Sequence, residues 1–156
     1  MPSRTTTDLA RTVQLLEQEL TLLARHQLSS AQHTPDLALD RSGYQLLSRL
    51  ELEPLTLKQL AEAFRLDIST VNRQIASLRT KGLVERIADP EGGIARLLRP
   101  TRRGLALLGE DRAVRHGQVS QVLGDWAPQD VERLQELLAR FNSSIEALEG
   151  QEWPRP

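Results

Sequence analysis

The sequence contains no cysteine, which excludes disulfides, thiol-based redox sensing and thiolate metal sites in this chain. It also lacks any apolar run that approaches the roughly 20 residues of a membrane-spanning helix. The first seven residues, Met1 to Thr7, do not form the apolar stretch of a signal peptide. These absences predict a cytoplasmic protein, and a length of 156 residues suits one domain with a buried core.

Signatures of catalysis and of cofactor binding are missing as well. There is no phosphate-binding loop, no Gly-x-Ser-x-Gly, no His-Glu-x-x-His and no glycine-rich dinucleotide turn. Acidic pairs such as Glu110 and Asp111 are adjacent in the sequence and therefore do not share a helix face. The only histidines, His26, His33 and His116, are scattered, which favours surface residues over metal ligands. The sequence predicts a protein that is not an enzyme and that holds no cofactor or metal.

Two short helices joined by a tight turn are predicted from residue 56 onward. Thr56 and Gln59 have the spacing of a capping box, in which each side chain bonds to the backbone amide of the other residue. Asp67 is a candidate N-cap for the second helix. The apolar residues of the first helix share one face, and they are Leu57, Leu60, Ala61 and Phe64.

In the second helix, apolar residues recur at steps of three and four and are expected to face the core. They are Ile68, Val71, Ile75 and Leu78. The polar residues left on the outside carry groups that hydrogen-bond to base edges and phosphates, and they are Ser69, Thr70, Asn72, Arg73 and Gln74. They lie near the helix N-terminus, where the macrodipole favours phosphate. A merely solvated face would more often carry Glu and Lys pairs.

A β-hairpin is predicted directly after this helix. Gly82 follows the last apolar position as a helix terminator, and residues 83–87 have the length and β-branched content of a strand. Residues 89–93 form the hairpin tip and residues 94–99 return as the second strand. Thr101 can cap the next helix. Two helices followed by a hairpin is the order of a winged helix-turn-helix, a DNA-reading arrangement.

Charge is distributed unevenly along the chain. Residues 55–104 hold ten Lys or Arg and five Asp or Glu, a net charge of +5, whereas the other 106 residues hold ten and sixteen, a net charge of −6. A basic module on an acidic body is an electrostatic footprint for DNA. The cations expected to add phosphate contacts are Lys58, Lys81, Arg86 and Arg96. The alternative is a small helical domain whose polar face is simply solvated.

Both ends of the chain carry near-heptad apolar stripes. The N-terminal stripe consists of Leu9, Val13, Leu16, Leu20 and Leu23, and the C-terminal stripe consists of Val131, Leu134, Leu138, Phe141, Ile145 and Leu148. This period suits a helix that packs against other helices along its length. Packing within a monomer is the alternative to packing between two copies.

The remaining segments are predicted to connect these parts. Asp40 can cap a helix over the following residues, and residues 29–38 carry turn formers that link it to the first helix. A long helix is expected over residues 102–126, and Pro128 opens the last helix. The tail from Gly150 is expected to be frayed, with Trp153 packed on a partner at most.

Several of these motifs together resemble the MarR (multiple antibiotic resistance regulator) family of transcription factors. The matching pieces are Leu60-Ala61, Ser69-Thr70-Val71-Asn72-Arg73, Gly82-Leu83-Val84-Glu85-Arg86, Asp89-Pro90 and Thr101-Arg102-Arg103-Gly104. With the flanking helices, the resemblance covers nearly the whole chain. The fold that it implies is mainly α with a small β-hairpin wing, plus a helical dimerisation region from both termini.

The sequence departs from the family pattern at two positions. The family usually has a glycine in the helix-turn-helix turn where this chain has Arg65, so the turn requires either another geometry or a strained arginine. Family wings usually carry arginines after the Asp-Pro pair, where this chain has Gly92, Gly93 and Ile94. A minor-groove contact by the wing is therefore in doubt, although Arg96 can substitute.

The resemblance implies a sequence-specific transcriptional regulator, a ligand-responsive repressor that binds a pseudo-palindromic operator in double-stranded DNA as a homodimer. The implied division is residues 1–53 for dimerisation and a pocket, 54–101 for the DNA-binding lobe, 102–149 for dimerisation and 150–156 for a frayed tail. A small-molecule effector is expected between the dimerisation helices and the lobe. The alternatives are a non-specific architectural DNA-binding protein and a winged-helix module that binds protein.

Overall fold

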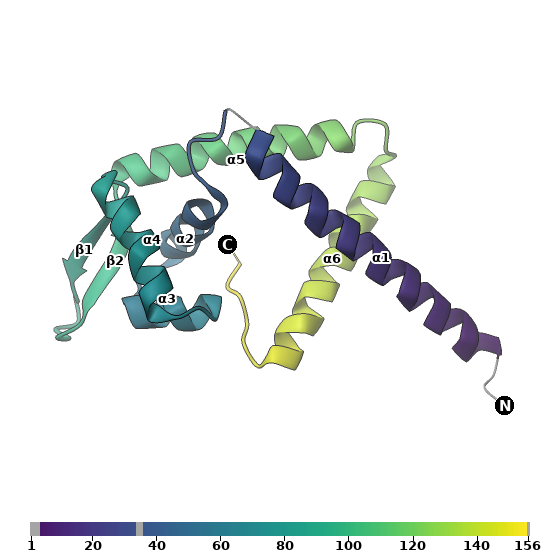
Figure 1. The fold of residues 1–156 in the computed structure, drawn as a ribbon, viewed down its shortest axis with the longest axis horizontal. Coiled ribbons are helices and arrows are strands. Elements are labelled where there is room, and N and C mark those ends of the chain that lie inside the picture. Colours follow the sequence, from purple (N-terminus) through teal and green to yellow (C-terminus); the bar gives the residue numbers. More distant parts are fainter. Residues whose placement is uncertain (1–3, 34–35, 156) are drawn as a thin grey trace. The chain divides into compact units, whose positions relative to one another are not determined.

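The computed structural model describes the backbone of residues 4–33 and 36–155, and the side chains of residues 8–26 and 36–155. The elements in chain order are α1 (Arg4–His33), α2 (Arg41–Leu52), α3 (Leu57–Phe64), α4 (Ile68–Thr80), β1 (Val84–Ala88), β2 (Arg96–Pro100), α5 (Arg102–Val122) and α6 (Pro128–Glu149) (Figure 1). This confirms the mainly α fold with a hairpin wing. Two compact units are present, residues 1–36 and residues 37–156. Among the described residues, none of the helices has the length and apolar character needed to cross a membrane.

Helix α1 forms the first unit, and its apolar stripe is open. Leu9, Val13, Leu16 and Leu23 are exposed within the described structure. The helix continues to His33, so the predicted link over residues 29–38 is wrong in its first half. The sequence has no glycine or proline between residue 4 and Pro35, and polar residues alone do not stop a helix that has no breaker. Residues 34 and 35 of the predicted link lie outside the described part of the chain.

The helix-turn-helix is built by the caps that the sequence predicts. Thr56 and Gln59 form the capping box, with Gln59 N donating to the Thr56 hydroxyl over 3.1 Å and Thr56 N donating to Gln59 Oε1 over 2.8 Å. Arg65 ends α3 in the left-handed region, with φ 52° and ψ 43°. The strained arginine is therefore the solution that this chain adopts. Asp67 is the N-cap residue of α4, but its side chain makes no capping hydrogen bond.

One core joins α2, α3, α4, the hairpin and the start of α5. Its buried apolar residues are Leu39, Leu46, Leu47, Leu50, Leu55, Leu60, Ala61, Val71, Ile75, Leu78, Leu83, Val84, Leu98 and Leu108. Ile68 is 50% exposed, so its predicted core position is wrong. Ile68 is the first residue of α4, and the helix reaches the core only one turn later, at Val71.

The wing is a two-stranded antiparallel sheet in which Val84 pairs with Pro100 and Ala88 pairs with Arg96. Leu55 adds a single bridge to Leu98, which ties the wing to the start of α3. The second strand starts later than predicted, at residue 96 rather than 94, whereas the first runs to residue 88, one residue further than predicted. Ile94, expected in the second strand, is fully exposed at 103%, because the turn through Gly92, with φ 84°, delays pairing until Arg96.

Helices α5 and α6 leave the core and return toward it, as Figure 1 shows. Thr101 caps α5 by accepting from Gly104 N over 3.0 Å, and its hydroxyl also donates to the Gly82 carbonyl over 2.7 Å. Helix α5 ends at Val122 rather than at residue 126. Pro128 opens α6 at its first turn, as predicted. None of the α6 side chains is buried within the described structure.

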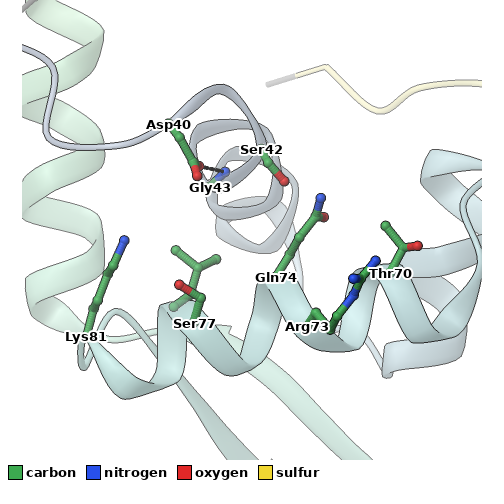
Figure 2. A pocket seen from close by; sticks show the side chains of 9 residues that line it. Asp40, Ser42, Gly43, Thr70, Arg73, Gln74, Ser77 and Lys81 are labelled. Carbon is green, nitrogen blue, oxygen red and sulfur yellow. Dashed lines mark hydrogen bonds between the residues drawn. The ribbon is translucent and has the colours of Figure 1, made fainter.

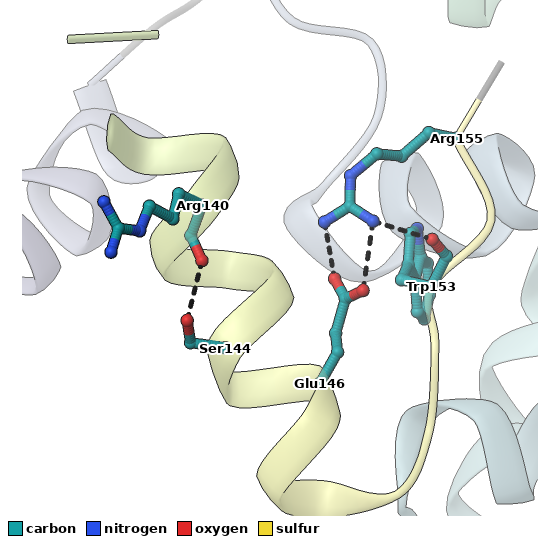
Figure 3. A network of polar contacts seen from close by, with 5 residues as sticks. All are labelled: Arg140, Ser144, Glu146, Trp153 and Arg155. Atoms are coloured by element: carbon teal, nitrogen blue, oxygen red, sulfur yellow. Dashed lines mark hydrogen bonds and ion pairs between the residues drawn. The ribbon is translucent and has the colours of Figure 1, made fainter. Parts of the chain in front are cut away.

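The tail after α6 is ordered up to Arg155, whereas the sequence predicts fraying from Gly150. Arg155 forms an ion pair with Glu146 over 2.6 Å and donates to the Trp153 carbonyl over 3.1 Å (Figure 3). The Trp153 ring packs edge-on against Phe64, with ring centroids 5.1 Å apart. The tail is held because its large side chains find aromatic and carboxylate partners in this same chain.

Candidate nucleic-acid interface

The predicted reading residues lie on the side of α4 that faces away from the core. Val71, Ile75 and Leu78 are buried on the inner side. On the outer side, three of the predicted residues are exposed, namely Ser69, Asn72 and Arg73, and two are half-buried, namely Thr70 and Gln74. Helical periodicity thus places the packing residues on one side of α4 and the polar residues on the other, as the sequence predicts.

A surface groove of 340 Å³ runs along this side of α4 and the N-terminal end of α2. It is lined by Asp40, Ser42, Gly43, Thr70, Arg73, Gln74, Ser77, Leu78 and Lys81. Figure 2 shows Gln74 of α4 and Lys81, which caps α4, reaching toward the end of α2 that carries Asp40 and Ser42. The groove brings three predicted reading residues together with one predicted phosphate-binding cation.

One hydrogen-bond acceptor that lines the groove has no partner among the described residues. The Oε1 atom of Gln74 is buried and has no hydrogen-bond partner among the described residues. A buried acceptor without a partner carries a desolvation cost, so it favours a donor from water or a ligand. The Asp40 carboxylate is already engaged, because it accepts from Gly43 N over 2.7 Å as the cap of α2.

Sequence reasoning missed the two serine hydroxyl groups that line the groove. Ser77 lies three and four positions beyond Gln74 and Arg73, so helical spacing alone could have placed it on the same face. Ser42 belongs to α2 and meets α4 only in the folded chain. No local sequence signal indicates that contact.

The cations of this region fall into two groups. Four predicted contacts, Arg73, Lys81, Arg86 and Arg96, form no ion pair with a described carboxylate. Others are engaged. The predicted contact Lys58 lies 3.9 Å from Glu62, and Arg99 forms a 2.7 Å pair with Glu85, while Arg65 pairs with Glu149 at 3.2 Å. Most predicted contacts are thus available to an anionic partner.

The strand register places the two wing cations on one face. Arg86 pairs with Leu98 and Ala88 pairs with Arg96. Since paired residues share a face and alternate residues do too, Arg86 and Arg96 project from the same side of the sheet. Arg99 lies on the opposite side. Arg96 is the first residue of β2 and so lies at the tip end of the paired strands.

A buried acid holds the segment that leads into α2, the helix whose N-terminal end lines the groove. Asp111 of α5 is 1% exposed, and its two carboxylate oxygens accept from the backbone amides of Ala38 and Leu39, each over 2.9 Å. These amides lie directly before α2. Nearby, Arg112 pairs with Glu51 over 2.7 Å, and this hydrogen bond raises the pKa of Arg112. Sequence reasoning missed Asp111, because its partners lie more than 70 positions away.

A second cavity, of 640 Å³, lies where α2 and α3 face α6 and the tail. Its lining residues are Tyr44, Gln45, Ser48, Ala63, Phe64, Arg65, Asn142, Glu146, Glu149, Gln151, Trp153 and Arg155. Aromatic rings and both signs of charge therefore meet in one place. Among the described residues, no three His, Asp or Glu side chains are grouped as metal ligands.

Comparison with known proteins defines the class to which this fold belongs. A MarR family profile matches residues 39–93. The uncharacterized HTH-type transcriptional regulator YxaD of Bacillus subtilis (strain 168) is 40% identical over 137 residues, which cover 85% of this chain and 94% of that protein.

Solved structures agree on the fold. The MarR family transcription regulator SP03579 has a TM-score of 0.74 at 17% identity, covering 96% of this chain and 100% of its own. FabT of Streptococcus pneumoniae, solved in complex with DNA, has a TM-score of 0.66 at 13% identity, covering 90% of this chain and 99% of its own. The chain belongs to the MarR family of winged helix-turn-helix transcriptional regulators.

Proposed function

We propose that this chain is a cytoplasmic, ligand-responsive repressor that binds a pseudo-palindromic operator as a homodimer. The observation that carries the proposal is the outer face of α4, where hydrogen-bonding side chains line an open groove beside cations without ion pairs. This is the chemistry that reads base edges and phosphates. The FabT structure, which shares the fold, is a complex with DNA.

Helix α4 would enter the major groove of each half-site. Arg73 is suited to a bidentate contact with guanine, and Asn72 or Gln74 to adenine. Ser69 and Thr70 would bind bases or phosphates near the N-terminus of the helix, where the macrodipole adds to the attraction. These contacts choose sequence.

The remaining predicted cations would bind phosphates without choosing sequence. Lys58 and Lys81 flank the helix pair, and Arg86 and Arg96 extend from one side of the wing. Each phosphate contact releases counterions, so this group sets the salt dependence of binding. The exposed, uncharged tip at Ile94 gives the wing a smaller part in affinity than an arginine tip would have.

Two copies would associate through the terminal helices, residues 1–53 and 102–149. Within the described structure, Leu9, Val13 and Leu16 of α1 are exposed, and so are Leu138 and Phe141 of α6. Contiguous apolar faces of this kind mark association surfaces. A two-fold dimer also presents two recognition helices, which a pseudo-palindromic operator requires.

The 640 Å³ cavity is the place proposed for an effector. It has the size of a small-molecule site and combines the rings of Tyr44, Phe64 and Trp153 with the guanidinium groups of Arg65 and Arg155. An effector that binds better to one arrangement of α3 against α6 would shift the dimer toward it. Even a small shift would change the register of the two recognition helices on DNA.

The test is binding to the DNA upstream of the gene and to random DNA of equal length, measured over a range of salt concentrations. We expect the upstream fragment to bind about 10³-fold tighter or more. Equal binding to both fragments would instead identify an architectural protein. If the chain binds neither fragment and its winged surface binds a protein, the protein-interaction alternative is supported.

A further inference from the structure

The turn between α3 and α4 contains the one described non-glycine residue with a positive φ, Arg65. The left-handed region is unfavourable for a side chain with a Cβ, whereas glycine adopts it freely. An arginine here needs a compensating role. Its backbone amide closes α3 by donating to the Glu62 carbonyl over 3.1 Å, which glycine would do equally well. The role must therefore lie in the side chain.

The Arg65 side chain binds the far end of the chain. Its guanidinium forms an ion pair with the Glu149 carboxylate at 3.2 Å, donates to the Glu149 carbonyl over 2.9 Å and donates to Gln151 Oε1 over 3.3 Å. In return, Gln151 Nε2 donates to the Glu62 carbonyl over 3.3 Å. The end of α3, with its cap Arg65, is thus linked to the last residue of α6 and to Gln151 of the tail, and each side donates hydrogen bonds to the other.

The tail adds a second set of contacts to α3, next to those of Arg65. Trp153 packs edge-on against Phe64 of α3, with an interplanar angle of 75°. The Arg49 guanidinium lies 6.0 Å from the Trp153 ring centroid. Arg155 anchors the same segment to Glu146 of α6 (Figure 3).

Stability alone does not explain this arrangement. The side chains of Arg65 and Glu149 are each about half exposed, 49% and 46%, and exposed ion pairs stabilise proteins only slightly. The strained turn cancels part of that small gain. What the contacts do provide is a fixed distance between α6 and Arg65, which lies three positions before the start of α4 at Ile68.

We propose that Arg65 is a positioning residue, which ties the recognition helix to the dimerisation helix α6 and so sets the spacing of the two recognition helices in the dimer. The inference rests on the proposed function, since spacing has meaning only for a dimer on two half-sites. Half-site separation is a geometric property of such a dimer. A tether at the turn acts on α4 directly, because α3 and α4 share that turn.

The experiment uses Arg65→Gly in the full chain, because glycine keeps the positive φ and removes only the side chain. Binding is measured on operators whose half-sites are separated by the native spacing and by one or two base pairs more or less, and on a single half-site. We expect the native operator to bind about five- to tenfold more weakly, a typical size for coupling between sites. The spacing preference should flatten, while single half-site binding and the melting temperature stay unchanged.

Two further variants distinguish a positioning role of Arg65 from a general effect of lost charge on DNA binding. Removal of residues 151–156 should flatten the spacing profile in the same way, and combining it with Arg65→Gly should add little to the change in affinity. Arg133→Ala, which removes a positive charge elsewhere on α6, should leave the profile as in the wild type. A wild-type protein that binds all spacings equally overturns both the proposed function and the tether. An Arg65→Gly variant that retains the spacing preference of a selective wild type overturns the tether alone.

Discussion

The winged lobe, residues 37–111, and the helical arms, α1 and α6, treat their apolar residues in opposite ways. The lobe gathers fourteen of them into one buried core. Within the described structure, the arms bury none: α6 has no buried residue, and every described side chain of α1 is exposed except the half-buried Leu20. The two regions have similar helical periodicity in the sequence, so periodicity alone does not say whether a stripe is satisfied within one chain.

This difference indicates which part of the molecule buries its apolar residues within a single chain. The lobe packs its apolar residues into one core of its own, and Asp111 accepts there from two amides of the segment before α2. The arms expose apolar stripes that water disfavours. A second copy of the chain would cover them, so the arms are where stability should depend on concentration and the lobe is where it should not.

Leu138→Glu should have the largest effect. It tests whether the apolar stripe of α6 is buried between two copies of the chain. Leu138 is 40% exposed here and lies in the middle of the α6 stripe. Losing a buried leucine costs about 1.5 to 3 kcal/mol, and in a symmetric dimer the loss occurs twice, about 3 to 6 kcal/mol per dimer. Sedimentation should show dissociation at micromolar concentration, and the exposed Glu132→Gln serves as the matched control. A variant that remains dimeric at wild-type affinity would show that the α6 stripe is not the interface.

Asp111→Ala tests the lobe in the same terms. It leaves two amides, those of Ala38 and Leu39, without their carboxylate acceptor, which should cost about 2 to 5 kcal/mol. Because the contact lies within one chain, the loss in unfolding free energy should not depend on protein concentration. Denaturant unfolding at two concentrations measures this, with Glu110→Ala, an exposed neighbour, as the control. A loss in unfolding free energy that depends on protein concentration would show instead that Asp111 acts through dimerisation.

The sequence predicts best what is local to it. The capping box of Thr56 and Gln59, the Thr101 cap and the opening of α6 at Pro128 are all confirmed, since each depends on residues a few positions apart. The inner face of α4 is confirmed except for Ile68, which lies before the helix reaches the core. The α4 residues assigned to base reading lie on its outer side, but their role there stays a prediction.

What the sequence could not predict depends on distant partners. Asp111 is indistinguishable from a surface acid until the amides of Ala38 and Leu39 meet it. The tail lacks periodicity and so reads as frayed, yet Trp153 finds Phe64 some 90 positions earlier. A positive φ was foreseeable at Arg65 from its place in the turn, but its partners on α6 were not.

Arg73→Ala should weaken specific binding by about 1 to 3 kcal/mol and relax base choice at one position of each half-site. This variant separates DNA binding by the lobe from association through the arms. Arg73 is an exposed lobe residue without a described ion pair, so its loss should leave folding and dimerisation unchanged. Selection of binding sites from random DNA measures the effect, with Arg79→Ala on the same helix as control. An unchanged selected site at unchanged affinity would show that Arg73 is not a reader.

Arg96→Ala should act more weakly and without regard to sequence. As a phosphate contact on the wing, Arg96 would contribute about one unit to the slope of log affinity against log salt. Binding to operator and to random DNA should fall by similar factors. Arg99→Ala, on the opposite side of the wing and already paired with Glu85, is the control. A loss confined to the operator would show instead that Arg96 reads the minor groove.

The smallest expected effect is at the end of the α6 arm, in acid. The hydrogen bond from Arg155 lowers the pKa of Glu146, so the pair favours the folded tail above the ordinary glutamate pKa of about 4.3 and loses this contribution as the pH falls through the lowered value. In a Trp126→Phe background, Trp153 emission reports on the tail while far-UV circular dichroism follows the helices. The emission change should have its midpoint below about pH 4.3, with the helices intact. Arg155→Gln should move that midpoint upward, because it removes the cation that stabilises the charged carboxylate. If Arg155→Gln titrates as the wild type does, the Arg155–Glu146 pair does not hold the tail, which is then held by Trp153 against Phe64 and by the hydrogen bonds of Gln151.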